Sequence, residues 1–446
     1  MCVRRCVITV GDLGEFGVIA RVSGRLPQGE TVLLGPGDDA AMVSAPDGRV
    51  VVSTDVLIEG RHFRRHWSSG YDVGRKAAAQ NLADVAAMGA VPTAIVVGLG
   101  IPAGLPVTWL DALTDGFRDE CALVGASVAG GDITRCDLVV IGVTVLGDLQ
   151  GRPPVERSGA RPGHVVAVAG RLGWSAAGLA LLESGRVPPP ATSATYEEPQ
   201  KTEVTPDEPA SPPDPSAPGG AISEGVRKPS DSPRGSAAAS GGGAPLGPSV
   251  SGAYGGIAEP EGVYRGGSGP EGAHRESSEA GDVCGGGSEA EGAPHGASVV
   301  PAPGGGAGGG EALGDLLGEA VGAHLRPRPP YSCGVEAARL GASAMIDVSD
   351  GLLQDLGHVA EAGGVRIDLD PGAFAVADAV AAAAGELGAD PLDWVLTGGE
   401  DHALAATFPP EVSLPASWRV VGRVSEGEGV HVRGRAPGRG GWDHFR

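Results

Sequence analysis

The stretch AMIDVSDGLLQDL, residues 344–356, decides how this chain folds. An apolar, β-prone run ends at a turn, and the spacing of the leucines that follow is helical. The stretch therefore predicts a strand that passes directly into a helix, as in α/β proteins. It also contains three aspartates, Asp347, Asp350 and Asp355. One carboxylate is enough to cap a helix N-terminus, so three indicate a further function.

The alternation of strands and helices extends over most of the sequence. β-prone runs lie at residues 50–60, 93–102, 137–149, 164–170, 343–349 and 365–370, and helical apolar spacing lies at residues 72–90, 108–126, 350–364 and 375–388. Glycine at or near the ends of the helical segments marks where they stop. We therefore predict an α/β or α+β protein of two domains, residues 1–150 and residues 151–446.

A low-complexity segment interrupts the second domain. Between residues 187 and 313, proline, glycine, serine and alanine dominate, and periodic apolar residues are missing. Such a segment cannot bury enough apolar surface to offset its ordering entropy. We therefore predict that residues 187–313 are a disordered insertion, a linker within an otherwise folded chain.

The composition excludes several kinds of partner. The chain has 446 residues, 41% of them hydrophobic, and a formal net charge of −22. Nucleic acids and anionic membranes would be repelled by this charge. The six cysteines include no CxxC pair, and no apolar run suits a signal peptide or a membrane span. We expect a soluble, cytoplasmic protein that binds neither nucleic acid nor membrane.

Acidic motifs recur along the folded part of the chain, and we expect each at a turn beside a strand or helix. They are GPGDDA (35–40), STDV (53–56), NLADVAAMGA (81–90), GGDIT (130–134), DVSDG (347–351) and TGGED (397–401). Carboxylates brought together repel each other unless a cation compensates them. Mg²⁺ is the cation that best fits such a cluster, because it is usually coordinated by a few protein carboxylates together with the phosphates of a substrate. Glycines beside the carboxylates let backbone approach a bulky anion, which favours a nucleotide.

Other catalytic patterns are missing from the sequence. It contains no GxxxxGK[ST] phosphate loop, no catalytic H-R-D of a protein kinase, no GxSxG elbow and no HExxH. His62 and His66 in HFRRH have the spacing of helical metal ligands. Because three arginines surround them, a solvated or anion-facing patch is the simpler interpretation.

Taken together, the motifs resemble the thiamine-monophosphate kinase family, whose superfamily also includes aminoimidazole ribonucleotide synthetase and selenophosphate synthetase. The resemblance rests on GEFGVIAR (14–21), GDDAA, STDVLIEGRHF, AAAQNLADVAAMGA, GGDITR, ERSGARPG, HLRPRPP, IDVSDGLLQDLGH, LTGGEDHAL and GWDHF, in this order. These motifs lie in both folded halves, and the segment at residues 187–313 lies outside the resemblance.

The resemblance implies both a fold and a reaction. The fold is the two-domain aminoimidazole ribonucleotide synthetase-like fold, with an N-terminal mixed-sheet domain that forms a homodimer and a C-terminal α/β domain. The reaction is direct, Mg²⁺-dependent transfer of the γ-phosphoryl group of ATP to thiamine phosphate, giving thiamine diphosphate and ADP. Such a transfer needs no general base, because the acceptor is a phosphate oxygen that is largely ionised at neutral pH.

The resemblance also implies roles for individual residues. Mg²⁺ ligands would be Asp39, Ser53, Thr54, Asp55, Asp84, Asp132, Asp347 and Asp350. Contacts to ATP would come from Gly131, Asp132, Arg157 and Ser349, and contacts to thiamine phosphate from His62, Glu400 and Trp442. Asp132, Arg157 and Asp350 would be the catalytic residues.

Each of these residues also has a simpler interpretation. Asp350 could only cap the following helix, Arg157 could be an exposed loop charge, and Trp442 could pack the C-terminus onto the core. Two alternatives for the whole chain also remain open at this point. It could act on another acceptor within the superfamily, or it could be a catalytically idle nucleotide-binding scaffold.

Overall fold

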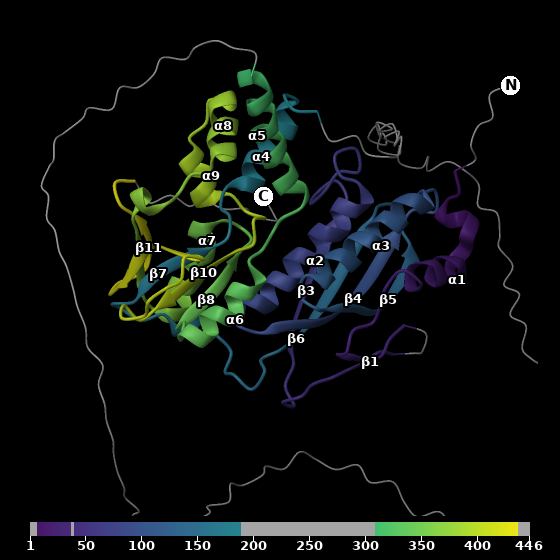
Figure 1. Ribbon diagram of the computed structural model, residues 1–446, viewed down its shortest axis with the longest axis horizontal. Coiled ribbons are helices and arrows are strands. Elements are labelled where there is room, and N and C mark those ends of the chain that lie inside the picture. Colours follow the sequence, from purple (N-terminus) through teal and green to yellow (C-terminus); the bar gives the residue numbers. More distant parts are fainter. Residues whose placement is uncertain (1–6, 37–39, 189–307, 436–446) are drawn as a thin grey trace, which may run out of the picture. The chain divides into compact units, whose positions relative to one another are not determined.

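A computed structural model describes residues 7–36, 40–188 and 308–435 (Figure 1). The described residues form two α/β halves within one compact unit. Most of the segment predicted to be a linker, residues 189–307, lies outside the described residues. The expected domain boundary near residue 150 stays a prediction.

The N-terminal half contains the mixed sheet that the resemblance implied. Its strand order is β3-β6-β4-β5, and only the β4–β5 pair is parallel. The strands are β3 (Val51–Ile58), β4 (Val91–Ile101), β5 (Ser127–Arg135) and β6 (Val140–Asp148). Helices α2 (Gly70–Ala87) and α3 (Val107–Ala122) lie along one face of this sheet (Figure 1). The core lies between these two layers and includes Leu82, Leu110 and Ile141.

Helices α2 and α3 approach each other unusually closely. A Cβ atom at Gly74 would lie 2.1 Å from the carbonyl oxygen of Leu113, and one at Gly116 would lie 2.3 Å from that of Tyr71. Only glycine permits such contact between backbones. The position of α2 over the sheet is therefore fixed, which matters because α2 supplies side chains to the site described below.

Smaller elements complete the N-terminal half. They are α1 (Val10–Ser23) and the hairpin of β1 (Val32–Leu34) and β2 (Met42–Val43). Helix α1 is attached to α3 by the ion pair Arg21–Asp111, which measures 2.5 Å between nitrogen and oxygen.

The C-terminal half is built on a six-stranded sheet of order β12-β9-β11-β7-β10-β8. Only the β12–β9 pair is parallel. The strands are β7 (Val165–Ala169), β8 (Ala344–Val348), β9 (Arg366–Leu369), β10 (Ala403–Phe408), β11 (Trp418–Ser425) and β12 (Gly429–Val432). The predicted strand-to-helix stretch is confirmed, since β8 leads into α7 (Leu352–Gly363). Helix α6 (Tyr331–Leu340) and two short 3-10 helices, Arg157–Gly159 and Pro371–Ala373, also belong to this half.

Four further helices form a separate apolar cluster in the C-terminal half. They are α4 (Trp174–Ser184), α5 (Gly308–Leu325), α8 (Asp378–Leu387) and α9 (Pro391–Thr397) (Figure 1). Helix α5 begins inside the stretch predicted to be linker. Its apolar side chains Leu317 and Val321 are buried against this cluster, and the glycine-rich composition around them hid their helical spacing.

Three of the acidic motifs expected at turns lie inside regular elements, and two of these elements are the strand at residues 50–60 and the helix at residues 72–90 that the sequence predicted. STDV belongs to β3, Asp84 belongs to α2, and GGDIT belongs to β5. The reason is that polar side chains on one face of a strand or helix can face a site without breaking the element. Among the described residues, no helix is long and apolar enough to cross a membrane.

Candidate active site

Two loops from the C-terminal half interlock beside the sheet. The backbone N–H of Glu400 donates to the carbonyl oxygen of Ser349 at 2.7 Å, and that of His402 donates to Val348 at 3.0 Å. A Cβ atom at Gly399 would lie 2.4 Å from the same Ser349 oxygen, so a larger residue would force the loops apart. Glu400 and His402 adopt positive φ angles of 63° and 52°. The motifs DVSDG and TGGED thus form one structure.

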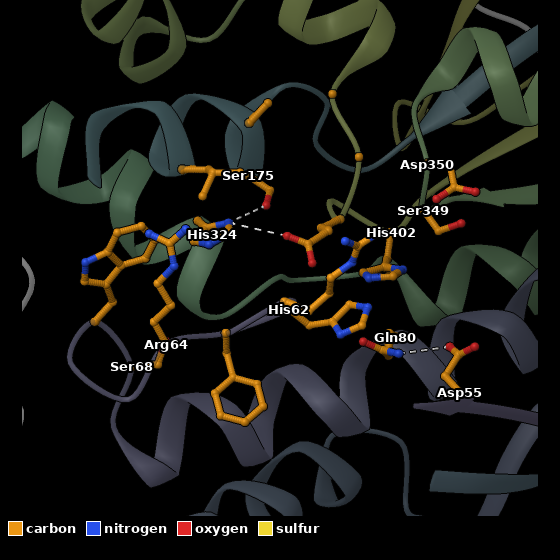
Figure 2. A pocket seen from close by; sticks show the side chains of 18 of the residues that line it. Asp55, His62, Arg64, Ser68, Gln80, Ser175, His324, Ser349, Asp350 and His402 are labelled. Carbon is orange, nitrogen blue, oxygen red and sulfur yellow. Dashed lines mark hydrogen bonds and ion pairs between the residues drawn. The ribbon is translucent and has the colours of Figure 1, made fainter. Parts of the chain in front are cut away.

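A cavity of about 720 Å³ lies between these loops and the elements of the N-terminal half. In Figure 2, Asp55, Ser349 and Asp350 lie toward one end of it, Arg64 and Ser175 lie toward the other, and His62 lies between them. Arg64 stacks over the Trp67 ring at 4.2 Å and pairs with Glu183 at 3.6 Å. The cavity therefore has an acidic end and an end with aromatic and basic side chains.

The acidic end combines carboxylates from both halves of the chain. Ser53 and Asp55 lie on the face of β3 that α2 covers, because side chains alternate along a strand. The Ser53 hydroxyl donates to Asp84 at 2.7 Å. Asp347 lies at the end of β8, and Asp350 follows in the turn. Burial and the charges of Asp347 and Asp55 raise the pKa of Asp84 to about 7.

This donor set fits a divalent cation. Buried carboxylates that repel each other gain most from a cation between them. Within the described ranges, no three or more His, Cys, Asp and Glu side chains are grouped so that they could hold a metal ion by themselves. Mg²⁺ does not need a site made of protein side chains alone, because waters and substrate phosphates supply several of its ligands.

The third aspartate of the opening stretch has a structural function. Asp355 accepts hydrogen bonds from the backbone N–H groups of Asp350 and Gly351, at 3.1 and 3.0 Å. It thereby fixes the turn between β8 and α7. Burial and the charges of Asp347 and Asp350 raise the pKa of Asp355 to about 7.

Helix α2 presents a row of three polar side chains to the site. Lys76, Gln80 and Asp84 are spaced four residues apart, so they lie on one face of the helix. Gln80 donates to Asp55 at 3.1 Å, and Lys76 donates to Glu400 at 3.1 Å. One helix thus connects the acidic end of the cavity with Glu400.

Glu400 remains ionised although protein surrounds it. Burial raises its pKa, but the charge and hydrogen bond of Lys76 together with His324 and His402 outweigh that effect, and the pKa falls to about 2. About a third of the side chain is exposed, and it lines the cavity. Burial and the charge of Lys76 lower the pKa of the neighbouring His324 to about 3, so its ring is neutral at pH 7.

His62 has one tautomer fixed by the backbone. Its Nδ1 accepts a hydrogen bond from the N–H of Ile58 at 3.0 Å. In the neutral ring the proton therefore lies on Nε2, which can act as a donor. His402 contacts the acidic end, with its Nδ1 3.2 Å from Asp347. Burial lowers the pKa of His402, but the hydrogen bond and charge of Asp347 outweigh it and raise the pKa.

Ser175, His324 and Glu400 superficially suggest a hydrolytic triad. Both partners approach the same ring nitrogen: Nδ1 of His324 lies 2.9 Å from the Ser175 hydroxyl and 3.6 Å from Glu400 (Figure 2). A triad requires the base to contact nucleophile and acid through different nitrogens. The cluster therefore holds this end of the cavity together and does not activate a nucleophile.

The residues implied by the resemblance divide into groups. The cavity lining includes Asp55, His62, Asp84, Asp347, Ser349, Asp350 and Glu400. Ser53 lies behind the lining and binds Asp84. Thr54 points to the opposite face of β3, where its hydroxyl donates to the carbonyl oxygen of Val143 at 2.9 Å.

The remaining implied residues lie elsewhere. Gly131 and Asp132 lie on an exposed part of β5, and Arg157 is exposed on a 3-10 helix. None of these three lines the cavity. Asp39 and Trp442 lie outside the described residues.

Several residues of the site were not identified from the sequence. Lys76 and Gln80 carried a usable signal, since they precede Asp84 by eight and four residues in a helix of mostly apolar residues. Ser175 carried none, and His324 begins the HLRPRPP motif, to which the sequence assigned no role. They come together only because α4 and α5 pack against each other in the helical cluster.

Comparison with known proteins connects this geometry to a family. The family model described as AIR synthase related protein, N-terminal domain, matches residues 37–149. A thiamine-monophosphate kinase of Mycobacterium tuberculosis (strain CDC 1551 / Oshkosh) is 40% identical over 440 residues, which cover 98% of this chain and 93% of the relative. A thiamine-monophosphate kinase of Corynebacterium glutamicum is 30% identical over 421 residues, covering 94% of this chain and 88% of the relative.

Solved structures share the fold. The thiamine-monophosphate kinase from Stenotrophomonas maltophilia K279a has a TM-score of 0.58 and 24% identity, and the match covers 94% of this chain and 95% of the other. The structure of AaThiL complexed with AMPPCP and TMP gives the same TM-score and identity, covering 98% and 99%. The expected aminoimidazole ribonucleotide synthetase-like fold is confirmed.

Proposed function

The chain belongs to the thiamine-monophosphate kinase family, and from this premise we propose that it transfers the γ-phosphoryl group of ATP to thiamine phosphate. The products are thiamine diphosphate and ADP. The observation that carries this proposal is one cavity whose lining combines four carboxylates at its acidic end, Asp55, Asp84, Asp347 and Asp350, with the ionised Glu400. The acidic end suits a metal-bound phosphate chain, and Glu400 suits a cationic ring.

Mg²⁺ is the cofactor that this donor set favours. Asp55, Asp84, Asp347 and Asp350 are the residues that would hold it, with Ser53 orienting Asp84. When bound, the ion would neutralise the phosphates during transfer. The predicted ligand Asp39 would join them from outside the described residues. The hydroxyl of Thr54 does not join this donor set, because it lies on the other face of β3.

ATP is the proposed phosphoryl donor. Ser349 and Asp350 lie in the turn after β8, where the Asp355 carboxylate holds the backbone in place. Their polar atoms would meet the phosphate chain beside the metal ligands. Gly131, Asp132 and Arg157 stay predicted contacts to ATP, and their exposure leaves them accessible to a ligand that extends beyond the cavity.

Thiamine phosphate is the proposed acceptor. Thiamine carries a cationic thiazolium ring, which a carboxylate held ionised across the physiological pH range would attract. Glu400 has this property. His62 is the predicted second contact, and it lines the cavity with its ring oriented by the N–H of Ile58. Trp442 stays a predicted contact outside the described residues.

The chemistry needs positioning more than covalent participation. Phosphoryl transfer proceeds with the attacking and leaving oxygens in line, and the charge spreads over the equatorial oxygens. The protein has to hold two phosphate chains end to end and exclude competing water. The interlocked loops fix Ser349 and Glu400 relative to each other, since they share a 2.7 Å backbone hydrogen bond. They could therefore set donor and acceptor at a defined separation.

We also propose that the protein is a homodimer. The face of β3 turned away from α2 exposes apolar side chains: Val52 is 62% exposed and Val56 is 51% exposed. Such a patch on a sheet face favours pairing with a second copy. A cytoplasmic location stays a prediction from the sequence.

The proposed function is tested by measuring ADP release from the protein incubated with ATP and Mg²⁺. Thiamine phosphate, free thiamine or neither is added. We expect release only with thiamine phosphate, and its loss in Asp132→Asn. Release with a different acceptor would favour another reaction of the superfamily. ATP binding without turnover on any acceptor would favour an idle nucleotide-binding scaffold.

A further inference from the structure

Lys76 is a buried cation beside the active site. Its side chain is 3% exposed, and it does not line the cavity. The sequence contains three lysines, Lys76, Lys201 and Lys228, and only Lys76 lies among the described residues. Charged side chains are rarely buried unless they are paired. The position of Lys76 therefore needs an explanation in terms of its partners.

Both hydrogen bonds of the ammonium group go to proposed acceptor contacts. Its Nζ donates to the Glu400 carboxylate at 3.1 Å and to the backbone carbonyl of His62 at 3.2 Å. Glu400 comes from the loop before β10, and His62 comes from the loop after β3. Lys76 thus bridges two loops that are 338 residues apart in sequence.

We infer that Lys76 is a positioning residue for the phosphoryl acceptor, because its ammonium group holds the Glu400 carboxylate and the His62 loop in a single arrangement. The inference deepens the proposed function and rests on it. Lys76 touches neither donor nor acceptor in this role. It acts through Glu400, whose second carboxylate oxygen is left to meet the cationic ring of thiamine phosphate.

The charges around Glu400 make Lys76 the decisive partner. From α2 it faces Lys76, from α5 it faces His324, and from its own loop it faces His402. Burial lowers the pKa of His324 to about 3, so it supplies no charge at pH 7. His402, which is hydrogen-bonded to Asp347, also lowers the pKa of Glu400, but by less than Lys76 does. Burial raises the pKa of Glu400, and Lys76 is the largest contribution that lowers it, so loss of Lys76 should raise this pKa.

A neighbouring arginine provides a matched control. Arg75 also lies on α2 and pairs with a buried glutamate, Glu120. Neither of these two residues lines the cavity. Arg75→Met therefore leaves a buried carboxylate without its cation, as Lys76→Met does, but at a position remote from the acceptor. The two variants separate a general loss of stability from a loss of positioning.

The test compares Lys76→Met, Arg75→Met and the unaltered full-length protein by initial rates of ADP release between pH 5 and pH 9. KM for thiamine phosphate and KM for ATP are determined at each pH. Thermal unfolding midpoints are measured in parallel. If Lys76→Met does not fold, Lys76→Gln takes its place, since glutamine keeps hydrogen-bond donors and removes the charge.

We expect Lys76→Met to raise KM for thiamine phosphate about 10- to 100-fold at pH 8, the range of a lost charged hydrogen bond, with little change in KM for ATP. At pH values below 6, the ratio of variant to wild-type kcat/KM should decrease further, because Glu400 of the variant takes up a proton there. Effects common to both proteins, such as titration of the substrate phosphate, cancel in this ratio. Arg75→Met should lower the unfolding midpoint and leave the ratio independent of pH.

A Glu400→Gln background adds a second readout. There the Lys76→Met replacement should no longer change the pH dependence, because no carboxyl remains to titrate. The inference is overturned if Lys76→Met matches Arg75→Met, with lower stability but an unchanged KM for thiamine phosphate and a flat ratio. If the unaltered protein releases no ADP with thiamine phosphate, the proposed function itself fails, and the inference fails with it.

Discussion

Replacing Asp84 with asparagine should stabilise the metal-free protein at alkaline pH while it abolishes activity. Asp84 is held among Asp55, Asp347 and the Ser53 hydroxyl, and burial and the two other carboxylates raise its pKa to about 7. Asparagine has nearly the same shape and still accepts the hydrogen bond from Ser53. It removes only the charge that its surroundings disfavour.

The size of the effect follows from the pKa. A carboxyl that has a higher pKa in the folded than in the unfolded chain binds its proton more tightly when folded. Its contribution to stability therefore falls as the pH rises from about 4 to above 7. The difference between about 7 and the ordinary 3.8 corresponds to roughly 4 kcal/mol, at about 1.4 kcal/mol per pKa unit. Because three carboxylates share the repulsion, we expect about 2 to 4 kcal/mol.

The assay is thermal unfolding with EDTA at pH 8 and pH 5, repeated with Mg²⁺. Asp84→Asn should unfold roughly 4 to 8 °C above the wild type at pH 8, and the gap should narrow at pH 5. Mg²⁺ should stabilise the wild type more than the variant, because the ion compensates the charge that the variant lacks. Asp137→Asn, which removes an exposed carboxylate, is the control. A variant less stable than the wild type at pH 8 in EDTA would refute the reasoning.

Three further predictions follow from contacts around the site. Glu120→Ala removes the acceptor shared by Arg75 and by the Tyr331 hydroxyl, which lies 2.6 Å away. The free energy of unfolding in urea should fall by about 3 to 5 kcal/mol. A fall below about 1 kcal/mol would contradict this prediction. Asp401 caps α4 by accepting hydrogen bonds from the N–H groups of Trp174 and Ser175 at 3.1 and 2.9 Å. Asp401→Ala should lower the free energy of unfolding by about 1 to 2 kcal/mol in the same assay, and Asp401→Asn, which keeps an acceptor, should lower it less. The reverse order would contradict the capping role. Gly399→Ala places a methyl group 2.4 Å from the Ser349 carbonyl oxygen and should displace the two loops. In the ADP-release assay, kcat/KM for thiamine phosphate should fall about 10- to 100-fold. Unchanged kinetics would show that the loops tolerate the displacement.

Many of the regular elements and the family could be predicted from the sequence. The segments at residues 50–60 and 72–90 were identified as a strand and a helix because period-2 and period-3.6 apolar patterns are local. The order and spacing of the acidic motifs identified the family, which the comparisons confirm. Patterns that depend on near neighbours in the chain were sufficient for this.

Other features depended on packing. Alternation along the predicted strand separates Thr54 from Ser53 and Asp55, but only the packing of α2 decides that the site lies on the face of Ser53 and Asp55. Helix α5 was hidden, because its apolar residues lie in a glycine-rich context and gain their stability from α4 and α8.

The sequence by itself determined which chemistry the chain carries: carboxylates for a metal, glycines for close approach, and the motif order of a kinase family. Only the tertiary structure decided which charges face one another. Lys76 reads as an ordinary helical lysine, and its pairing with Glu400 exists because two loops from different halves close over α2. Local patterns fix secondary structure, whereas the ionisation of a buried group depends on neighbours that only folding brings within a few ångströms.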